Sequence, residues 1–259
     1  MSVIGVLSRD TVPGESTPAL AGIADEAHRI GSGLILCADF GFAGAEHLAM
    51  SGCVLLDQTV DEHDLTFLAD HAIPFVSIGR RDCPGRLVPY VDIDYAAGVR
   101  GLVARVAELG HQRIVYLGLT HGAASVERQH GFRTAVTALG LYGVHVPAVW
   151  LNQLLSIGVT AVITEHPDDA VALIGAARRR GLSVPGHLSV LTLDTPEHDG
   201  LEITGMRVPR RETGCHAVQL LSSRSQSVPQ ELFACEFVAG ATLAGPLVLQ
   251  QRNGERHEI

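Results

Sequence analysis

Carboxylate, hydroxyl and imidazole side chains follow several short apolar runs of the chain. The residues that stand directly after these runs are Asp39, Asp57, Asp94, Thr120-His121, Glu165-His166 and Asp194. A carboxylate accepts hydrogen bonds, and a neutral imidazole offers one donor and one acceptor nitrogen. Such groups suit the recognition of a small polar ligand, provided that the strands before them end at one edge of a sheet.

The densest group of possible metal ligands is the tetrapeptide "DEHD" at 61–64. It opens the helical pattern "DEHDLTFLADHA", and acidic side chains are favoured at the positive N-terminal end of a helix. We therefore interpret it as a solvated helix start and predict no metal site. The 13 histidines of the chain also lack the i, i+4 pairing of a metal-binding helix.

Motifs for the common catalytic chemistries are missing from the sequence. The dinucleotide fingerprint GxGxxG, the Walker loop, HExxH and GxSxG do not occur. No pair of residues suggests a nucleophile with its base. We therefore predict that the chain is not an enzyme and that it uses no cofactor.

Apolar runs and helical patterns alternate along the chain. The runs expected as strands are 3–7, 33–39, 52–58, 73–80, 113–118, 160–164 and 188–194. Unbroken apolar runs of this length are typical of strands buried on both faces of a parallel sheet. Helices are indicated at 94–110, 167–181 and, more weakly, 211–221. The alternation predicts an α/β fold with two doubly wound parallel-sheet lobes, in which ligands bind beyond the carboxyl ends of the strands.

A histidine stands at the expected start of the helix that begins with Pro167. Proline is favoured at the first helical position. This makes His166 the N-cap, where serine, threonine, aspartate and asparagine are preferred. Asp168 and Asp169 are then ordinary acids of a first helical turn. Because the cap residue is unusual, His166 is a candidate for ligand contact, and a packing or solvent-facing role is the alternative.

Composition indicates a globular protein and argues against a nucleic-acid-binding surface. The chain has 259 residues and a formal net charge of −9, whereas phosphate contacts need clustered lysine and arginine. The five cysteines include no CxxC pair, which fits a reducing cytoplasm. The sequence shows neither a signal peptide nor an apolar run long enough for a membrane span. We therefore expect a cytoplasmic protein without a membrane partner.

Four stretches of the chain together resemble the LacI family of transcription regulators. They are "VPYVDIDYAAGVRGLVARVAELGHQRIVYLG" at 88–118, "SVERQHGFRTAV" at 125–136, "TAVITEHPDDAVALIGAARRRGLSVPGHLSVLTLD" at 160–194 and "MRVPRRETGCHAVQLL" at 206–221. The resemblance implies a periplasmic-binding-protein-like type I sensor, with two lobes around a cleft and pairing as a homodimer. Family members carry a helix-turn-helix head before this sensor, whereas this sequence opens directly on the first strand. We therefore expect contact with DNA only through a head that is absent from the chain.

The resemblance and the order of elements also predict the domain boundaries. The N-terminal lobe is expected at 1–92, with a returning helix near 207–224. The C-terminal lobe is expected at 93–206, with a final strand near 231–245. The last residues, 246–259, are expected to form a polar tail.

Three residues match cleft positions of the family by their place in these segments. Asp94 matches the aspartate at the lobe junction, Arg128 the cleft arginine and Asp194 the cleft aspartate. Each has a structural alternative: a helix cap for Asp94, an ion pair for Arg128 and a turn cap for Asp194. Because a guanidinium donates and a carboxylate accepts, Arg128 and Asp194 could together hold a hydroxyl-rich or heterocyclic ligand in one orientation.

The chain departs from the family where further ligand contacts are expected. It has His166-Pro167 where the family has Asn-Asp, and the family's stacking aromatic residues are hard to place. Trp150 is the only tryptophan. It is a candidate platform for a sugar or base, with packing as the alternative. Tyr95 and His121 are weaker candidates for ligand contact.

Taken together, these expectations predict that the chain is the ligand-sensing and dimerisation domain of a LacI-type regulator. We expect it to bind a small polar effector, such as a sugar, a sugar derivative or a nucleoside-like molecule, in the cleft between the lobes. The alternative is a solute-binding protein of a transport system, which shares the fold. The sequence names neither the effector nor the direction of its effect.

Overall fold

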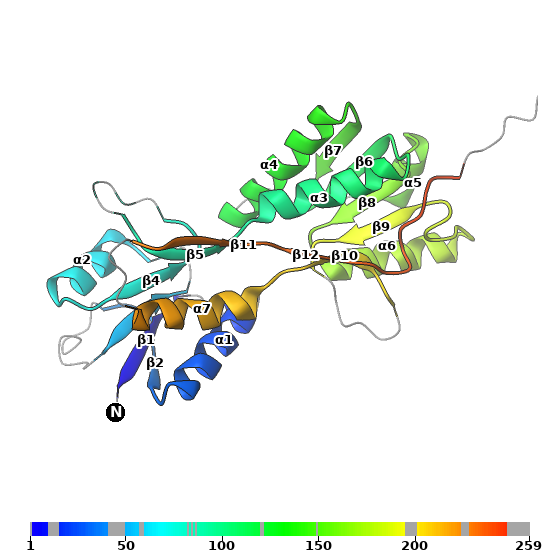
Figure 1. Cartoon of the computed structure of the whole chain (residues 1–259). Coiled ribbons are helices and arrows are strands. Elements are labelled where there is room, and N and C mark those ends of the chain that lie inside the picture. The colour runs from blue at the N-terminus through cyan, green and yellow to red at the C-terminus, as the bar shows by residue number, and fades with distance from the viewer. Residues whose placement is uncertain are drawn as a thin grey trace, which may run out of the picture. The chain divides into compact units, whose positions relative to one another are not determined.

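Two units make up the chain in the computed structural model, which describes residues 2–9, 16–40, 50–56, 60–81, 83, 85, 87–119, 122–148, 150–194, 201–223 and 228–247. Unit 1 contains Met1–Asp94 and Val208–Cys235. Unit 2 contains Tyr95–Arg207 and Glu236–Ile259. The described part of each unit holds a six-stranded sheet (Figure 1). Each unit is therefore built from segments that lie far apart in the sequence.

The sheet of unit 1 is parallel in all of its described strand pairs. Its strand order is β11 (Gln230–Phe233), β5 (Tyr90–Ile93), β4 (Phe75–Ile78), β3 (Gly52–Leu55), β1 (Val3–Leu7) and β2 (Gly33–Cys37). The inner strand β3 is buried over its whole length, whereas only the last residue of the edge strand β2 is buried. The apolar runs at β3 and β2 therefore both predicted a strand correctly. Burial on both faces, which the runs also predicted, is present in the inner strand β3 but not in the edge strand β2.

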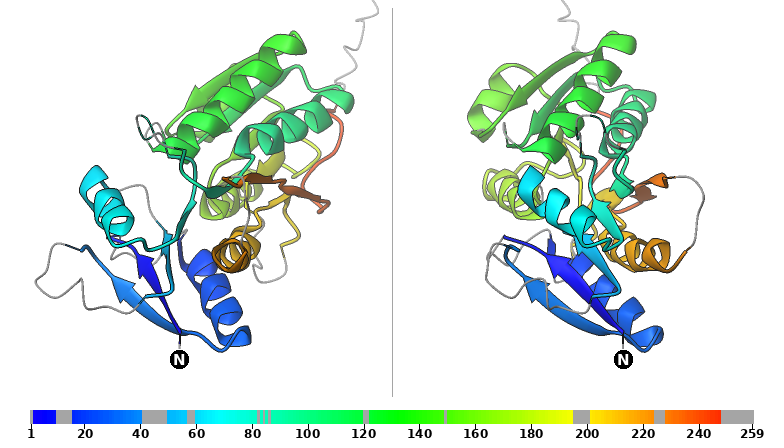
Figure 2. Two further views of the ribbon diagram at one scale, coloured as in Figure 1. Left: turned by 60° about the vertical axis from the view of Figure 1, so that its left-hand side comes forward. Right: turned by 90° about the vertical axis from the view of Figure 1, so that its left-hand side faces the viewer.

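Two helices of unit 1 approach each other closely through glycines. The described helices of this unit are α1 (Ser16–Arg29), α2 (Glu62–Asp70) and α7 (Arg210–Ser222). Both views of Figure 2 show α1 and α7 side by side. A Cβ atom on Gly22 would collide with the carbonyl oxygen of Arg211, and one on Gly214 would collide with that of Ala19. The two backbones can pack at this distance only because neither glycine carries a side chain.

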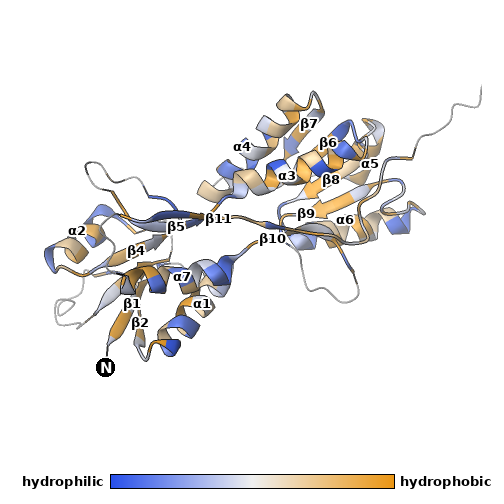
Figure 3. Ribbon diagram, in the orientation of Figure 1, coloured by the Kyte–Doolittle hydropathy of each residue, from blue (hydrophilic) through white to orange (hydrophobic). Residues whose placement is uncertain are grey.

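The sheet of unit 2 is parallel except at one edge, where β12 pairs antiparallel with β10. Its strand order is β12 (Glu236–Val238), β10 (Thr204–Arg207), β9 (Ser189–Thr192), β8 (Ala161–Thr164), β6 (Arg113–Leu117) and β7 (Tyr142–Val146). The strands β8 and β9 are buried throughout. Figure 3 shows the apolar residues concentrated in such strands. The carboxyl ends of β6, β8 and β9 lie at the same edge of the sheet, because these strands are parallel neighbours.

Two of the described helices of unit 2, α3 and α6, bury the apolar stripes that the sequence predicted. The described helices are α3 (Tyr95–Glu108), α4 (Ala123–Ala138), α5 (Leu151–Ser156) and α6 (Pro167–Arg179), of which α4 and α5 were not predicted. In α3 the buried positions include Val99, Leu102 and Val106, and in α6 they include Leu173 and Ile174. Together with the two sheets, these helices confirm the predicted α/β class with two doubly wound parallel sheets.

The run at 231–240 differs from the single final strand that the sequence suggested for the second lobe. It forms two short strands that belong to different sheets. β11 pairs parallel with β5 in unit 1, and β12 pairs antiparallel with β10 in unit 2. Both strands carry apolar side chains, so nothing in the composition of the run marks the point where the chain leaves one sheet for the other.

Other elements were missed or lie outside the described residues. The strands β7 and β10 were not predicted, since "YGVHV" and "TGMR" interrupt their apolar residues with glycine and polar groups. The polar tail is described only as far as residue 247, so most of it lies outside the described residues. Across the described residues, no helix combines the length and apolarity needed to cross a membrane.

Candidate functional site

Glu165 is the centre of a buried polar group at the carboxyl edge of the sheet of unit 2. It directly follows β8, and its side chain is fully buried. The backbone N–H of Leu119 donates to Glu165 Oε2 over 2.8 Å. The hydroxyl of Ser125 donates to Oε1 over 2.7 Å, and Arg128 Nη1 donates to the same oxygen. We call Glu165, Ser125, Arg128 and the Leu119 N–H the Glu165 cluster.

Arg128 lies in this cluster as the partner of Glu165. Only 4% of its side chain is exposed. Its guanidinium carbon stands 4.2 Å from the centre of the Tyr95 ring, so the cation also contacts an aromatic face. The ion pair that the sequence left open as an alternative for Arg128 is therefore present. Contact between Arg128 and a ligand stays a prediction.

The charge of Glu165 is set by two opposing effects. Burial raises the pKa of its carboxyl group, but hydrogen bonds from Ser125, Arg128 and Leu119 and the positive charge of Arg128 outweigh this effect. The net pKa of Glu165 lies below its ordinary value. The carboxylate is therefore ionised at neutral pH, and the buried pair consists of two opposite charges.

Gly118 makes room for the Glu165 carboxylate. It follows β6, and a Cβ atom at this position would collide with Glu165 Oε2 and would come within 2.9 Å of Glu165 Cβ and of the Tyr116 ring. Sequence reasoning had selected Glu165 only as one of several residues after a strand, and it had missed Gly118 and Ser125. The sequence carries no local signal for these two residues, because their contacts with Glu165 join segments that lie 40 or more residues apart.

His166 occupies the N-cap of α6, with Pro167 in the first turn, as the sequence predicted. Its side chain makes no capping hydrogen bond. Its carbonyl oxygen accepts a hydrogen bond of 3.0 Å from the hydroxyl of Thr164. His166 directly follows Glu165 in the sequence, and the residue is half-buried. The position is thus occupied without the usual capping function, and both ligand contact and a packing or solvent-facing role stay predictions for this side chain.

The two predicted aspartates stand at the ends of strands. Asp194 comes two residues after β9 and is half-buried. Asp94 follows β5 and directly precedes α3, and its backbone N–H donates to the carbonyl of Phe233 over 2.9 Å. Asp94 is the last residue of the first segment of unit 1, whereas Asp194 belongs to unit 2. Their contact with a ligand stays a prediction.

Trp150 does not join the other candidates. Its side chain is exposed at 75%. It lines a shallow surface depression with Arg179 and Arg180, which end α6, whereas His166 begins the same helix. The 13 residues of α6 span about 20 Å. His121, the remaining candidate, lies outside the described residues.

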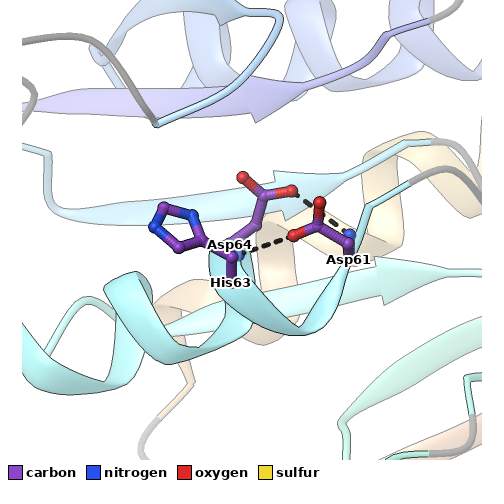
Figure 4. A group of neighbouring side chains, drawn as sticks. All are labelled: Asp61, His63 and Asp64. Atoms are coloured by element: carbon purple, nitrogen blue, oxygen red, sulfur yellow. Dashed lines mark hydrogen bonds between the residues drawn. The ribbon is translucent and has the colours of Figure 1, made fainter.

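The acidic group in unit 1 is a helix start, as the sequence predicted, but Asp64 is buried rather than solvated (Figure 4). Asp61 caps α2 and accepts a hydrogen bond of 3.1 Å from the backbone N–H of Asp64, whose side chain accepts one of 3.2 Å in return. Arg9 Nη2 lies 2.7 Å from Asp64 Oδ2. His63 brings a third possible ligand atom within 4.8 Å of these oxygens. The hydrogen bond from Asp64 lowers the pKa of Asp61 below its ordinary value.

The family model for a periplasmic binding protein-like domain matches residues 103–238, which is more than half of the chain. The chain belongs to this family. The match is consistent with the LacI resemblance seen in the sequence, and the curated relatives that the chain matches are described as transcriptional regulators.

Two relatives of this periplasmic binding protein-like chain are described as helix-turn-helix regulators. An uncharacterised one from Streptomyces limosus is 30% identical over 172 residues, which cover 58% of this chain and 48% of that protein. One from Mycolicibacterium smegmatis is 25% identical over 276 residues, which cover 88% of this chain and 75% of that protein. The chain thus spans about half the length of the Streptomyces limosus relative.

The fold of this periplasmic binding protein-like chain recurs in solved structures. The crystal structure of a LacI family transcriptional regulator from Enterococcus faecium with bound ribose has a TM-score of 0.77. It is 20% identical, and the match covers 94% of this chain and 99% of that chain. The likeness confirms the predicted type I architecture.

Proposed function

We propose that the chain senses a small polar effector for a LacI-type transcription regulator of the cytoplasm. The effector is a sugar, a sugar derivative or a nucleoside-like molecule. The Glu165 cluster carries the proposal, because it fixes charged groups where the strands of an α/β sheet end, which is where such folds bind ligands. The ribose in the Enterococcus faecium structure supports the class of ligand.

The proposed contacts follow from the side chains around the cluster. Asp194 accepts hydrogen bonds from ligand hydroxyls, and His166 can donate or accept because its imidazole is not used as a cap. Tyr95 and Arg128 supply an aromatic face and a cation at the base of the site, and Asp94 lies beside α3. Trp150 and His121 remain predictions at positions separate from this group or outside the described residues.

The proposed output is a change in DNA binding. In this proposal a helix-turn-helix segment, of the kind named in the two relatives, reads DNA, and two copies of the chain pair as a homodimer. An effector alters DNA binding only to the extent that it binds one conformational state better than another. Inducers and co-repressors differ in which state they favour.

A ligand screen followed by one substitution tests the proposal. Thermal denaturation with ribose, other sugars, sugar phosphates and nucleosides should identify a stabilising compound. Asp194→Ala should then bind this compound roughly 10- to 100-fold more weakly, since it loses a charge-assisted hydrogen bond. Glu108→Ala is the matched control, because Glu108 is an exposed acid of unit 2 that pairs with Arg105 over 3.0 Å at the end of α3.

Two results would count against the proposal. Equal stabilisation of the parent and Asp194→Ala would place the ligand elsewhere. A reading frame that encodes a secretion signal, rather than a helix-turn-helix, upstream of these residues would favour a solute-binding protein of a transport system. That alternative has the same fold and would bind solutes without changing DNA binding.

A further inference from the structure

Three hydrogen-bond donors from two parts of unit 2 converge on one carboxylate. The N–H of Leu119 comes from the loop after β6, and the Ser125 hydroxyl and the Arg128 guanidinium come from α4. A backbone N–H, a hydroxyl and a guanidinium together are donors that proteins use to hold carboxylate or phosphate groups of ligands. In this chain the anion that they hold is the side chain of Glu165.

The fit of Glu165 among these donors is close. Its side chain has no exposed surface, and Gly118 leaves the space that Glu165 Oε2 occupies. One face of the Arg128 guanidinium lies over the ring of Tyr95. An anionic group of a ligand that binds Arg128 Nη1 would have to displace Glu165, and one that binds beside this contact would lie against the carboxylate. The first costs a buried ion pair, and the second brings two like charges together.

The remaining charges near the ends of β8 and β9 do not restore an attraction for anions. Asp194 follows β9, and Asp168 and Asp169 lie in the first turn of α6. The N-terminus of a helix carries a partial positive charge. The two acids of the first turn of α6 counteract this charge. Together with Glu165, these three aspartates place carboxylates in both of the described segments that follow β8 and β9.

We propose that Glu165 closes this edge of unit 2 to anionic ligands, so that the site takes an uncharged, hydroxyl-rich effector and rejects its phosphorylated or carboxylated counterpart. This inference rests on the proposed function, because it specifies the charge of the same effector. Hydroxyl groups suit such a site, since they donate to carboxylates and also accept from imidazole or guanidinium donors.

Inorganic phosphate is a probe that tests the inference without knowledge of the effector. Calorimetry and thermal denaturation of the parent chain should detect no phosphate binding. Glu165→Gln keeps the shape of the side chain and removes its charge, which leaves the positive charge of Arg128 without compensation. We expect this variant to bind phosphate at least about tenfold more tightly than the parent.

Matched pairs of compounds extend the test to ligands. We expect the parent to prefer D-ribose to ribose 5-phosphate and adenosine to adenosine monophosphate. In Glu165→Gln the preference within any pair that binds should shift toward the phosphorylated member. If no neutral probe binds the parent, the proposed function loses support, whereas the phosphate gain of Glu165→Gln still decides the present inference.

Two further variants separate charge from loss of structure. The double variant Glu165→Gln with Arg128→Gln has polar side chains without either charge at both positions, and it should not gain phosphate binding. Glu108→Gln removes a distant exposed acid and should behave as the parent does.

Any one of three results would overturn the inference. They are phosphate binding by the parent, tighter binding of the phosphorylated member of a pair by the parent, and equal phosphate affinity of the parent and a folded Glu165→Gln. If Glu165→Gln fails to fold, phosphate binding by the parent and the parent's preference within the compound pairs still decide whether the inference holds.

Discussion

Two acidic groups, one in each unit, neutralise an arginine in different ways. In unit 1, Asp61 and Asp64 cap α2 and pair with Arg9; the Asp64 side chain is 1% exposed, but that of Arg9 is 28% exposed and that of Asp61 57%. In unit 2, Glu165 pairs with Arg128, and at most 4% of either side chain is exposed. The first group thus joins a buried carboxylate to a partly exposed arginine, whereas both members of the second pair are buried.

The two groups should differ in how much stability the protein loses when one member of the ion pair is removed. Arg9 is partly exposed, so water can solvate its guanidinium when a carboxylate partner is lost, and that loss costs little stability. A buried charge that loses its partner has no such solvent and is strongly destabilising. Unit 2 therefore depends on both members of its pair, and it keeps a charged group in place at the edge of the sheet where we propose that the effector binds.

The largest expected effect is that of Glu165→Ala. It leaves the Arg128 guanidinium buried without its carboxylate, which should lower the free energy of unfolding by about 3–5 kcal/mol. Urea denaturation of the parent and the variant measures this difference. The double variant Glu165→Leu with Arg128→Met is the control, because it removes both charges, and it should lose less than Glu165→Ala does. If Glu165→Ala lost less free energy of unfolding than a variant that removes an exposed acid, the buried pair would not be important for stability.

Gly118→Ala should have the next largest effect. The added Cβ would meet the Glu165 carboxylate and the Tyr116 ring, and forcing atoms into a filled interior costs about 1–3 kcal/mol. Gly101→Ala in α3 is the matched control, since a Cβ there meets nothing within 4 Å. It should be neutral or stabilising, because alanine favours helices over glycine. Equal melting temperatures for both variants would show that Glu165 moves freely to make room.

Asp64→Ala should have the smallest effect. It removes the returning hydrogen bond of the capping box and the nearer of the two carboxylates that pair with Arg9, while Asp61 stays beside Arg9, and we expect a loss of about 1 kcal/mol. Urea denaturation in low and high salt measures it, and high salt should reduce the difference because Arg9 is partly exposed. A loss as large as that of Glu165→Ala would remove the distinction between the two groups.

Local signals explain which parts of the structure could be predicted. The start of α6 at Pro167 and the start of α2 at "DEHD" depend on residues within one helical turn, and both were found from the sequence. The inner strands were found because burial on both faces gives unbroken apolar runs. The division of 231–240 between two sheets was not found, since pairing partners are not encoded in a run.

The candidate site shows the same limit. Asp194 and Glu165 were selected from their places after strands, and an ion pair was left open for Arg128, but Glu165 was not predicted as its partner. Each partner of Glu165 lies in another element. The family resemblance directed attention to Arg128 as a ligand contact, and it could not show the carboxylate that this chain supplies to it.

The close packing of α1 against α7 cannot form early during synthesis of the chain, because the two helices lie far apart in the sequence. During synthesis, residues 95–207 emerge after the first segment of unit 1 and before α7 and β11. Until residue 222 has left the ribosome, the face of α1 that includes Ala19 and Ile23 lacks the helix that covers it. Unit 1 is therefore the part of the nascent chain that stays open to chaperones and to aggregation for the longest time.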